Sequence, residues 1–364
     1  GHVVAMDSPS GRKPGTFHWA STLWHELSHV FVLTATRHRV PRWFTEGFAV
    51  HEETEAAPDW GDRMTPEIVA AIAAKQLLPV SELDRGFNRP KYPQQVIVSY
   101  FQAGRICDYI QTKWSYDKLL DMMRLFGQRK TTPEVNQQAL GMTPEAFDKE
   151  FLAWVEREAG TAVSKAAEWR KGMTELATLK RASDYAAIVE QGNRLIAIYP
   201  DFVEPGSAYE AVAEACLELK NKDGSRRALE QYASKGGKTP ESLKKLAGLQ
   251  EEAGGKAEAA RTLEKINYIY PMNGEAMHRK LGELSLDLGR TQAAVREFEA
   301  VVAGGPMDAA AAHYDLARAY VKAGDKGKAA EQVFLALEAA PGYKPAQRLM
   351  LELNADKGGR KENE

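Results

Sequence analysis

The chain has 364 residues, of which 44% are hydrophobic and 27% are charged, and its formal net charge is −2. This length can supply two or three domains that each bury a core. Because no basic excess is available to neutralise phosphates, the charge argues against a nucleic acid or an anionic membrane as partner, and no apolar run is long enough to span a membrane.

The chain begins with Gly1 and His2 instead of methionine, and no signal peptide is visible. We therefore expect that the native N-terminus is missing. The two cysteines, Cys107 and Cys216, are too few and too far apart for a disulfide framework and lack the spacing of zinc ligands. We expect both to be buried thiols among apolar helical residues, so any metal must be held by nitrogen and oxygen.

Residues 3–6 predict a short strand, and a loop follows at residues 7–11. Apolar residues then recur with a helical period over residues 17–35. This expected helix contains the sequence HELSH at residues 25–29. Because helical residues four apart share a face, the imidazoles of His25 and His29 can converge on one ion with Glu26 beside them. The pattern is typical of two zinc ligands and a general base.

A hydrolytic zinc site needs a third protein ligand and one open position. Residues 37–40 interrupt the first helix, and Pro41 suits the first turn of a second one. A short turn between the helices would fold the second back against the first and bring the Glu46 carboxylate to the ion. The sequence therefore predicts a metal site made of His25, His29 and Glu46.

An alternative is that His25 and His29 are ordinary helix-surface or core histidines and that Glu26 belongs to a solvated face. However, six of the eight histidines lie within the first 51 residues, and helix packing does not require that clustering.

The other polar residues around the motif carry weaker signals. His18 shares a face with His25, but nothing marks it as a ligand, and His38 and His51 are expected in loops or at the rim. The acidic run at residues 52–55 either contacts the metal ligands without binding the metal itself, or it forms the solvated end of a helix.

At these residues the chain resembles the gluzincin metallopeptidases, the group that includes thermolysin-like enzymes and the large zinc aminopeptidases. HELSH is followed by Glu46 within PRWFTEGFA, which is similar to the W-L-x-E-G-x-A signature of the peptidase-MA-like branch. The resemblance implies Zn²⁺ as cofactor, with His25, His29 and Glu46 as its ligands. It also implies that Glu26 is the general base of peptide-bond hydrolysis.

In gluzincins an edge strand beside the active-site helix pairs with the extended substrate, and the resemblance gives residues 3–6 this role. Residues 4–8 are loosely similar to the substrate-binding G-x-M-E-N strand of zinc aminopeptidases, but the glycine, glutamate and asparagine are all replaced. An aminopeptidase therefore remains an alternative to an endopeptidase.

Thr65 and Pro66 predict the start of a helix that runs to about residue 76. The polar residues 85–95 predict a surface loop at the rim of the cleft. The next expected helix, at about 96–114, contains Tyr100. In the family a tyrosine that opens the helix after such a loop donates a hydrogen bond to the oxyanion, so the resemblance points to Tyr100. A core role for this residue is equally open, and Tyr92 is the second choice.

Further helices are expected at residues 116–126, 133–140 and 144–158. All seven tryptophans lie at or before Trp169, so the composition changes near residues 160–175. The rest is repetitive: alanines at intervals of about 34 residues are each followed by a proline 12 or 13 residues later, and three share a glycine five residues earlier. These positions are Ala187, Ala228, Ala259, Ala294 and Ala329, with Pro200, Pro240, Pro271, Pro306 and Pro341 and with Gly254, Gly289 and Gly324.

This pattern resembles the tetratricopeptide repeat (TPR), in which stacked helical hairpins form a groove for an extended peptide or a partner helix. A purely structural role, in which the repeats buttress the peptidase or join subunits, remains open.

We therefore expect a mainly α chain with a helical, gluzincin-like zinc metallopeptidase domain and a short N-terminal edge strand at residues 1–165. TPR-like hairpins should form an α-solenoid at residues 166–353, and a disordered tail should follow at 354–364. Peptides or proteins are the expected substrates, and a protein partner is possible in the repeat groove. The other alternative is a TPR scaffold whose zinc site is structural or latent. The composition is that of a soluble globular protein, and the resemblance implies a bacterial source, with either the cytoplasm or the periplasm as compartment; the sequence does not decide between the two.

Overall fold

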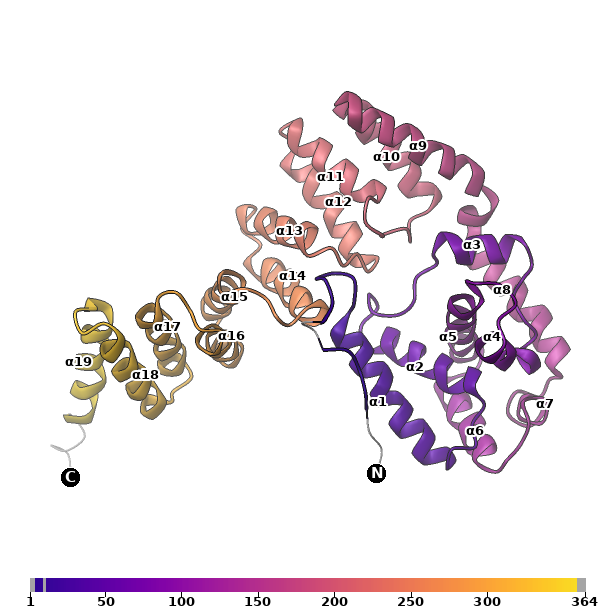
Figure 1. Cartoon of the computed structure of the whole chain (residues 1–364), viewed down its shortest axis with the longest axis horizontal. Helices are drawn as coiled ribbons and strands as arrows, with labels where there is room; N and C mark the ends of the chain where they lie inside the picture. Colours follow the sequence, from indigo (N-terminus) through magenta and orange to yellow (C-terminus); the bar gives the residue numbers. More distant parts are fainter. Residues whose placement is uncertain (1–3, 9–10, 359–364) are drawn as a thin grey trace. The chain divides into compact units, whose positions relative to one another are not determined.

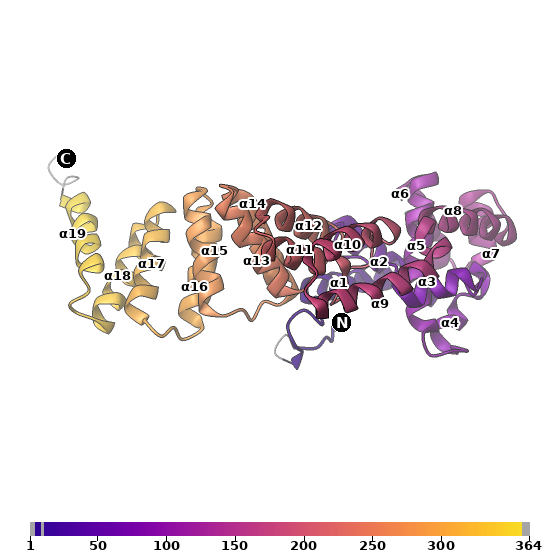
Figure 2. The same cartoon turned by 90° about the horizontal axis from the view of Figure 1, so that it is seen from above.

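The computed structural model describes residues 4–8 and 11–358. Every regular element in these residues is a helix, so the expected mainly α fold is confirmed (Figures 1 and 2). The chain divides into two compact units, residues 1–242 and 243–364. The domain boundary expected at residue 165 lies inside the first unit and stays a prediction.

Residues 4–6, the described part of the expected N-terminal strand, have no regular secondary structure, and Val3 lies outside the described residues. A strand needs a neighbour that satisfies its backbone N–H and C=O groups. Residues 4–8 and 11–358 contain no other strand that could do so.

The first two helices, α1 (Trp19–Thr36) and α2 (Arg42–Ala56), pack against each other. His18 caps α1, because its ring Nδ1 accepts a hydrogen bond from the Ser21 backbone N–H. The helix ends at Arg37, which adopts the left-handed conformation with φ of 53°. Pro41 is the N-cap residue of α2. The sequence predicted it within the first turn, which begins one position later at Arg42.

Helix α2 crosses α5 (Gln95–Lys113) at very short range. A Cβ atom on Gly47 would lie 2.4 Å from the carbonyl oxygen of Ala103, and one on Gly104 would lie 2.6 Å from Val50 Cγ1. The two glycines therefore let the helix backbones approach more closely than larger residues would. This contact belongs to a core that includes the buried rings of Trp43 and Phe44.

Five further helices and two short helical turns complete the part of the first unit that precedes the repeats. They are α3 (Pro66–Ala73), η2 (Val80–Glu82), α4 (Asp84–Asn88), α6 (Tyr116–Gly127), α7 (Thr132–Val135), η3 (Asn136–Leu140) and α8 (Pro144–Ser164). The helices expected from residues 65, 96, 116, 133 and 144 are thus confirmed.

The expectation of a continuous loop at residues 85–95 is wrong at its start, where α4 lies. Gly86 and Phe87 of this helix are buried against the core. In addition, the Asp84 carboxylate accepts a hydrogen bond of 2.7 Å from the Trp43 backbone N–H at the start of α2. Helix α4 therefore supplies the anionic cap that Pro41 cannot provide.

From residue 166 the chain forms the expected solenoid of helical hairpins. Its helices are α9 (Ala166–Ala182), α10 (Tyr185–Ile198), α11 (Ala208–Glu218), α12 (Lys222–Ser234), α13 (Pro240–Glu252), α14 (Lys256–Ile269), α15 (Glu275–Asp287), α16 (Thr291–Ala303), α17 (Ala309–Lys322), α18 (Lys326–Ala339) and α19 (Lys344–Gly358). Within the second unit α15 to α18 lie side by side (Figure 2).

The repeated small residues have the positions that the sequence pattern predicts. Ala259, Ala294 and Ala329 are buried in the second helix of successive hairpins. Gly254, Gly289 and Gly324 form the turns within these hairpins, with φ of 85°, 70° and 82°. Glycine adopts this left-handed conformation without the steric cost that other residues meet.

Three smaller expectations can also be compared with the structure. Cys107 and Cys216 are unpaired and buried, as expected. Helix α19 continues through residues 354–358, where the tail was expected to lack structure, and residues 359–364 lie outside the described part of the chain. Within that part, no helix combines the length and apolarity that a membrane crossing requires.

The close contact of α2 and α5 leads to a stability prediction. Gly47→Ala should lower the free energy of unfolding by roughly 1–3 kcal/mol, because the added methyl group meets backbone atoms that cannot move aside. Gly248→Ala is the control, since this exposed position of α13 has no atom within 4 Å of an added Cβ. It should stabilise the protein by roughly 0.5–1 kcal/mol. Urea unfolding followed by circular dichroism measures both, and a Gly47→Ala protein as stable as wild type would contradict the close crossing.

Candidate metal centre

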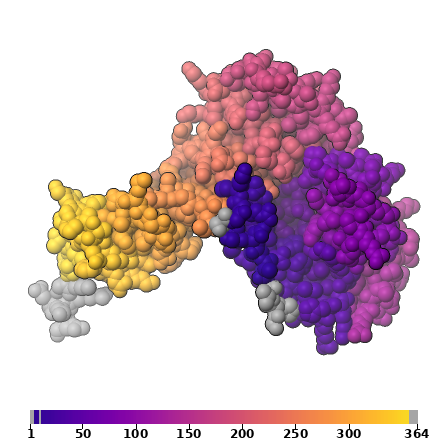
Figure 3. Space-filling view, in the orientation of Figure 1, coloured from indigo at the N-terminus to yellow at the C-terminus, as the bar shows by residue number. Residues whose placement is uncertain are grey.

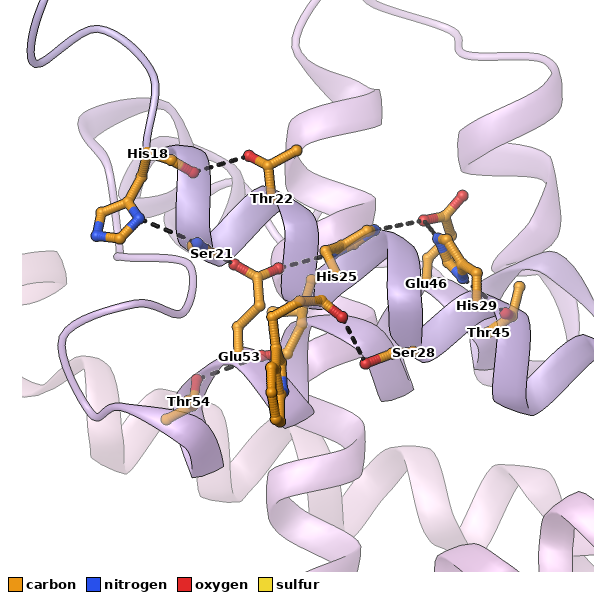
Figure 4. A network of polar contacts seen from close by, with 12 residues as sticks. His18, Ser21, Thr22, His25, Ser28, His29, Thr45, Glu46, Glu53 and Thr54 are labelled. Atoms are coloured by element: carbon orange, nitrogen blue, oxygen red, sulfur yellow. Dashed lines mark hydrogen bonds and ion pairs between the residues drawn. The ribbon is translucent and has the colours of Figure 1, made fainter. Parts of the chain in front are cut away.

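The side chains of His25 and His29 on α1 and of Glu46 on α2 converge on one point (Figure 4). One potential ligand atom from each lies within 4.8 Å of the others. Glu46 Oε2 is 3.3 Å from His25 Nε2 and 3.2 Å from His29 Nε2. The structure thus brings together the three residues that the sequence predicts as ligands. In the described residues no other group of three such side chains is arranged in this way.

The second nitrogen of each imidazole is held by another side chain. His25 Nδ1 lies 2.7 Å from Glu53 Oε1, and His29 Nδ1 lies 2.9 Å from Thr45 Oγ1. Glu53 in turn accepts a hydrogen bond from the Ser21 hydroxyl. Metal-binding histidines are usually oriented through the nitrogen that does not bind the metal. The arrangement therefore leaves Nε2 of both rings for a cation.

The electrostatics of the cluster favour positive charge. Burial raises the pKa of the Glu46 carboxyl, but the hydrogen bonds and charges of His25 and His29 outweigh this effect and hold the pKa below its usual range. Burial lowers the pKa of the His25 imidazole, whereas Glu46 and Glu53 together raise it to about 10. The same carboxylates would stabilise a divalent cation, which competes with the proton for the imidazole nitrogen.

Glu26 lines a cavity of about 280 Å³ together with His29 and Glu46 of the cluster. Its lining residues are Val4, Glu26, His29, Val30, Leu33, Thr45 and Glu46. The predicted general base therefore faces the same space as two of the predicted ligands. Val4 belongs to the segment that the sequence placed along the cleft, so this residue lies at the site although it forms no strand. Figure 3 shows the N-terminal segment on the surface of the first unit.

Tyr100 lies beside the cluster, with its ring centroid 6.2 Å from that of His25. Burial and the Glu46 carboxylate raise the pKa of the Tyr100 phenol, against the opposing effect of Arg42. The phenol therefore keeps its proton and can donate a hydrogen bond. Tyr92 lines a different cavity, together with residues of α3 and with Arg170.

The other histidines near the motif have structural partners. His18 caps α1. His51 is buried instead of lying at the rim. Its Nδ1 lies 2.7 Å from Asp108 Oδ1, and its Nε2 lies 2.7 Å from Gln111 Oε1. His38 follows α1 with φ of 59°.

Of the acidic run at residues 52–55, Glu53 lies behind the cluster, Glu52 contacts a neighbouring helix, and Glu55 is exposed near the end of α2. Glu53 points to His25, whereas Glu52 accepts a hydrogen bond of 2.8 Å from the Tyr116 hydroxyl. A signal for Glu53 exists in the sequence, since it follows Glu46 by seven residues and so lies on the same helix face. No such signal marked Thr45.

Comparisons with known proteins bear on both parts of the chain. The family model of the Peptidase MA superfamily matches residues 10–157, which include α1, α2 and α5. No curated protein sequence matches the chain.

Similar solved structures are repeat proteins. MamA 41-end from Desulfovibrio magneticus RS-1 is 24% identical with a TM-score of 0.34, and the match covers 42% of this chain and 85% of that one. YrrB, described as a TPR protein with an unusual peptide-binding site, is 16% identical with a TM-score of 0.36, over 51% of this chain and 96% of that one. A thermophilic TPR protein from Thermus thermophilus is 17% identical with a TM-score of 0.27, over 51% of this chain and 99% of that one.

The contact between Glu53 and His25 leads to a prediction about metal affinity. Glu53→Ala should weaken Zn²⁺ binding by roughly 10–100-fold, because the imidazole loses the partner that orients it. Glu53→Gln should have a smaller effect, since its amide oxygen still accepts from Nδ1–H. Competition with a chromogenic chelator measures the affinity. The control is Glu52→Ala, which removes an adjacent carboxylate that contacts Tyr116; equal affinities of Glu52→Ala and Glu53→Ala would contradict the orienting role.

Proposed function

We propose that this protein is a zinc-dependent peptidase of the gluzincin type. The observation that carries the proposal is the convergence of two imidazoles and one carboxylate, with the Nδ1 atom of each imidazole already held by another side chain. Glu26 lines a cavity together with His29 and Glu46. Two histidines, one carboxylate and an open position form the usual protein contribution to a hydrolytic zinc site. The match to the Peptidase MA superfamily supports the same reaction class.

In this proposal His25, His29 and Glu46 bind Zn²⁺, which as a Lewis acid would lower the pKa of a water molecule and polarise the scissile carbonyl. Glu26 accepts the proton of the attacking water and passes it to the leaving amine. Thr45 and Glu53 keep the imidazoles in the orientation that exposes Nε2. Tyr100 donates a hydrogen bond to the oxyanion that develops on the carbonyl oxygen.

We also propose that the repeats of the second unit bind the substrate or a partner protein. The supporting observation is an apolar cavity of about 370 Å³ between α13, α14 and α15. Leu263, Met277 and Leu284 contribute to its wall, while Lys244 and Lys280 also line it. An apolar hollow with a few charged residues suits an apolar side chain on a polypeptide.

The role of Glu26 leads to the central test. Glu26→Gln should retain Zn²⁺ and lower the rate of peptide hydrolysis by on the order of 10²–10⁴-fold, because the amide cannot accept the proton. Metal content by mass spectrometry and cleavage of casein and of a blocked peptide, with and without a chelator, test both statements. Glu52→Gln is the matched control. A Glu26→Gln protein as active as wild type would end this mechanism, and a wild-type protein that takes up no metal would favour the scaffold alternative.

The cavity of the second unit provides a test of substrate binding. Gly248→Phe should fill the cavity and lower the cleavage of a long protein substrate several-fold, while the cleavage of a short blocked peptide stays unchanged, because the peptide needs only the site in the first unit. Gly248 is exposed and has open space above it, so the side chain can be added without a clash. Gly248→Ala, which adds one methyl group, is the control. Equal losses with both substrates would contradict a binding role for this cavity.

A further inference from the structure

Arg42 occupies a position that helix stability does not explain. It is the first residue of α2, where the helix dipole disfavours a positive charge. Asp84 of α4 supplies the anion that this end of the helix prefers. The position of the Arg42 guanidinium therefore needs an explanation other than the stability of α2.

The contacts of Arg42 show where the guanidinium is directed. Its Nε donates a hydrogen bond of 3.2 Å to Glu46 Oε1, and its Nη1 donates one of 3.3 Å to Asn88 Oδ1. Its Cζ lies 5.4 Å from the centre of the Phe87 ring. Residues of α4 thus contact the guanidinium in addition to Glu46, although the Arg42 side chain is 44% exposed.

The two oxygens of Glu46 consequently have different partners. Oε2 lies 3.3 Å and 3.2 Å from the Nε2 atoms of His25 and His29, whereas Oε1 accepts the hydrogen bond from Arg42. From this division we infer that Arg42 is a positioning residue, which holds Oε1 so that Glu46 presents only Oε2 to a metal ion. The inference rests on the proposed function, because it concerns the ion that His25, His29 and Glu46 would bind.

The number of carboxylate oxygens that reach the ion matters for hydrolysis. A hydrolytic zinc site needs one position that is free for water or substrate. A carboxylate without a partner on its second oxygen can rotate and bind through both oxygens, which would occupy that position. The hydrogen bond from Arg42 Nε to Oε1 opposes this rotation, because the N–H of a planar guanidinium has a fixed direction that the ammonium of a lysine lacks.

An ordinary surface ion pair is the simpler explanation for the contact between Arg42 and Glu46. Exposed pairs of residues four apart on a helix contribute little to stability. Such a pair would affect the free energy of unfolding slightly and would leave the coordination of a metal unchanged. The geometry of the bound metal therefore separates the two explanations, independently of peptidase activity.

The experiment compares wild type, Arg42→Ala and Arg42→Lys in the full chain. Each protein is loaded with Co²⁺ in place of Zn²⁺, and its visible spectrum is recorded, because four-coordinate Co²⁺ absorbs much more strongly than five-coordinate Co²⁺. Arg42→Ala should lose most of this intensity and bind Zn²⁺ roughly 10-fold more weakly. Arg42→Lys should fall between Arg42→Ala and wild type. Arg85→Ala is the control, since Arg85 has a similar exposure of 43% and pairs with Glu82 outside the cluster.

The possible outcomes separate this inference from the proposed function. A wild-type protein that binds neither metal overturns both. A wild-type protein that binds metal, with the same spectrum and affinity in Arg42→Ala, overturns only the role of Arg42. Asn88→Ala provides a second variant if Arg42→Ala does not fold, because it keeps the charge and releases the guanidinium. It should shift the spectrum in the same direction by less, and an unchanged Asn88→Ala spectrum would then overturn the inference.

Discussion

The buried carboxylate of Glu46 is the constraint on which the candidate site depends. An ionised carboxylate that is removed from water is costly unless it is paired and hydrogen-bonded. Here two imidazoles face one oxygen and Arg42 binds the other. These contacts exist only if α1 and α2 keep one relative position. Helix α2 is held in turn by its close approach to α5 at Gly47 and Gly104, which ties the polar cluster to the apolar core.

The parts of the site that follow from local geometry were predictable from the sequence. The spacing of His25 and His29 places them one turn apart on any helix. The interruption before Pro41 then predicts a helical hairpin, which is enough to bring Glu46 opposite them. The same reasoning predicts the repeats, because an alanine, a glycine and a proline at fixed offsets specify where two helices cross, turn and end.

The parts that depend on how helices rotate against each other were not predictable. No sequence pattern marked Thr45 as the partner of His29, because that contact depends on how α2 is rotated against α1. Arg42 has a role only because α4 brings Asn88 and Phe87 beside it, and the polar residues of α4 predicted a loop. The metal ligands can thus be predicted from local sequence pattern. The residues that contact these ligands depend on tertiary packing.

Small residues show the same limit in the second unit. Ala259 and Gly248 both line the apolar cavity, but Ala259 is buried where two helices meet, while Gly248 is exposed and has no neighbour within 4 Å of an added Cβ. Ala259 allows the close contact that the repeat pattern predicts, whereas no pattern marks Gly248 as open space. The cavity therefore arises from the stacking of α13, α14 and α15 and not from a motif. For this reason motif analysis finds the candidate metal centre in the first unit and predicts a groove in the repeats, but it does not show which residues of the second unit line the cavity.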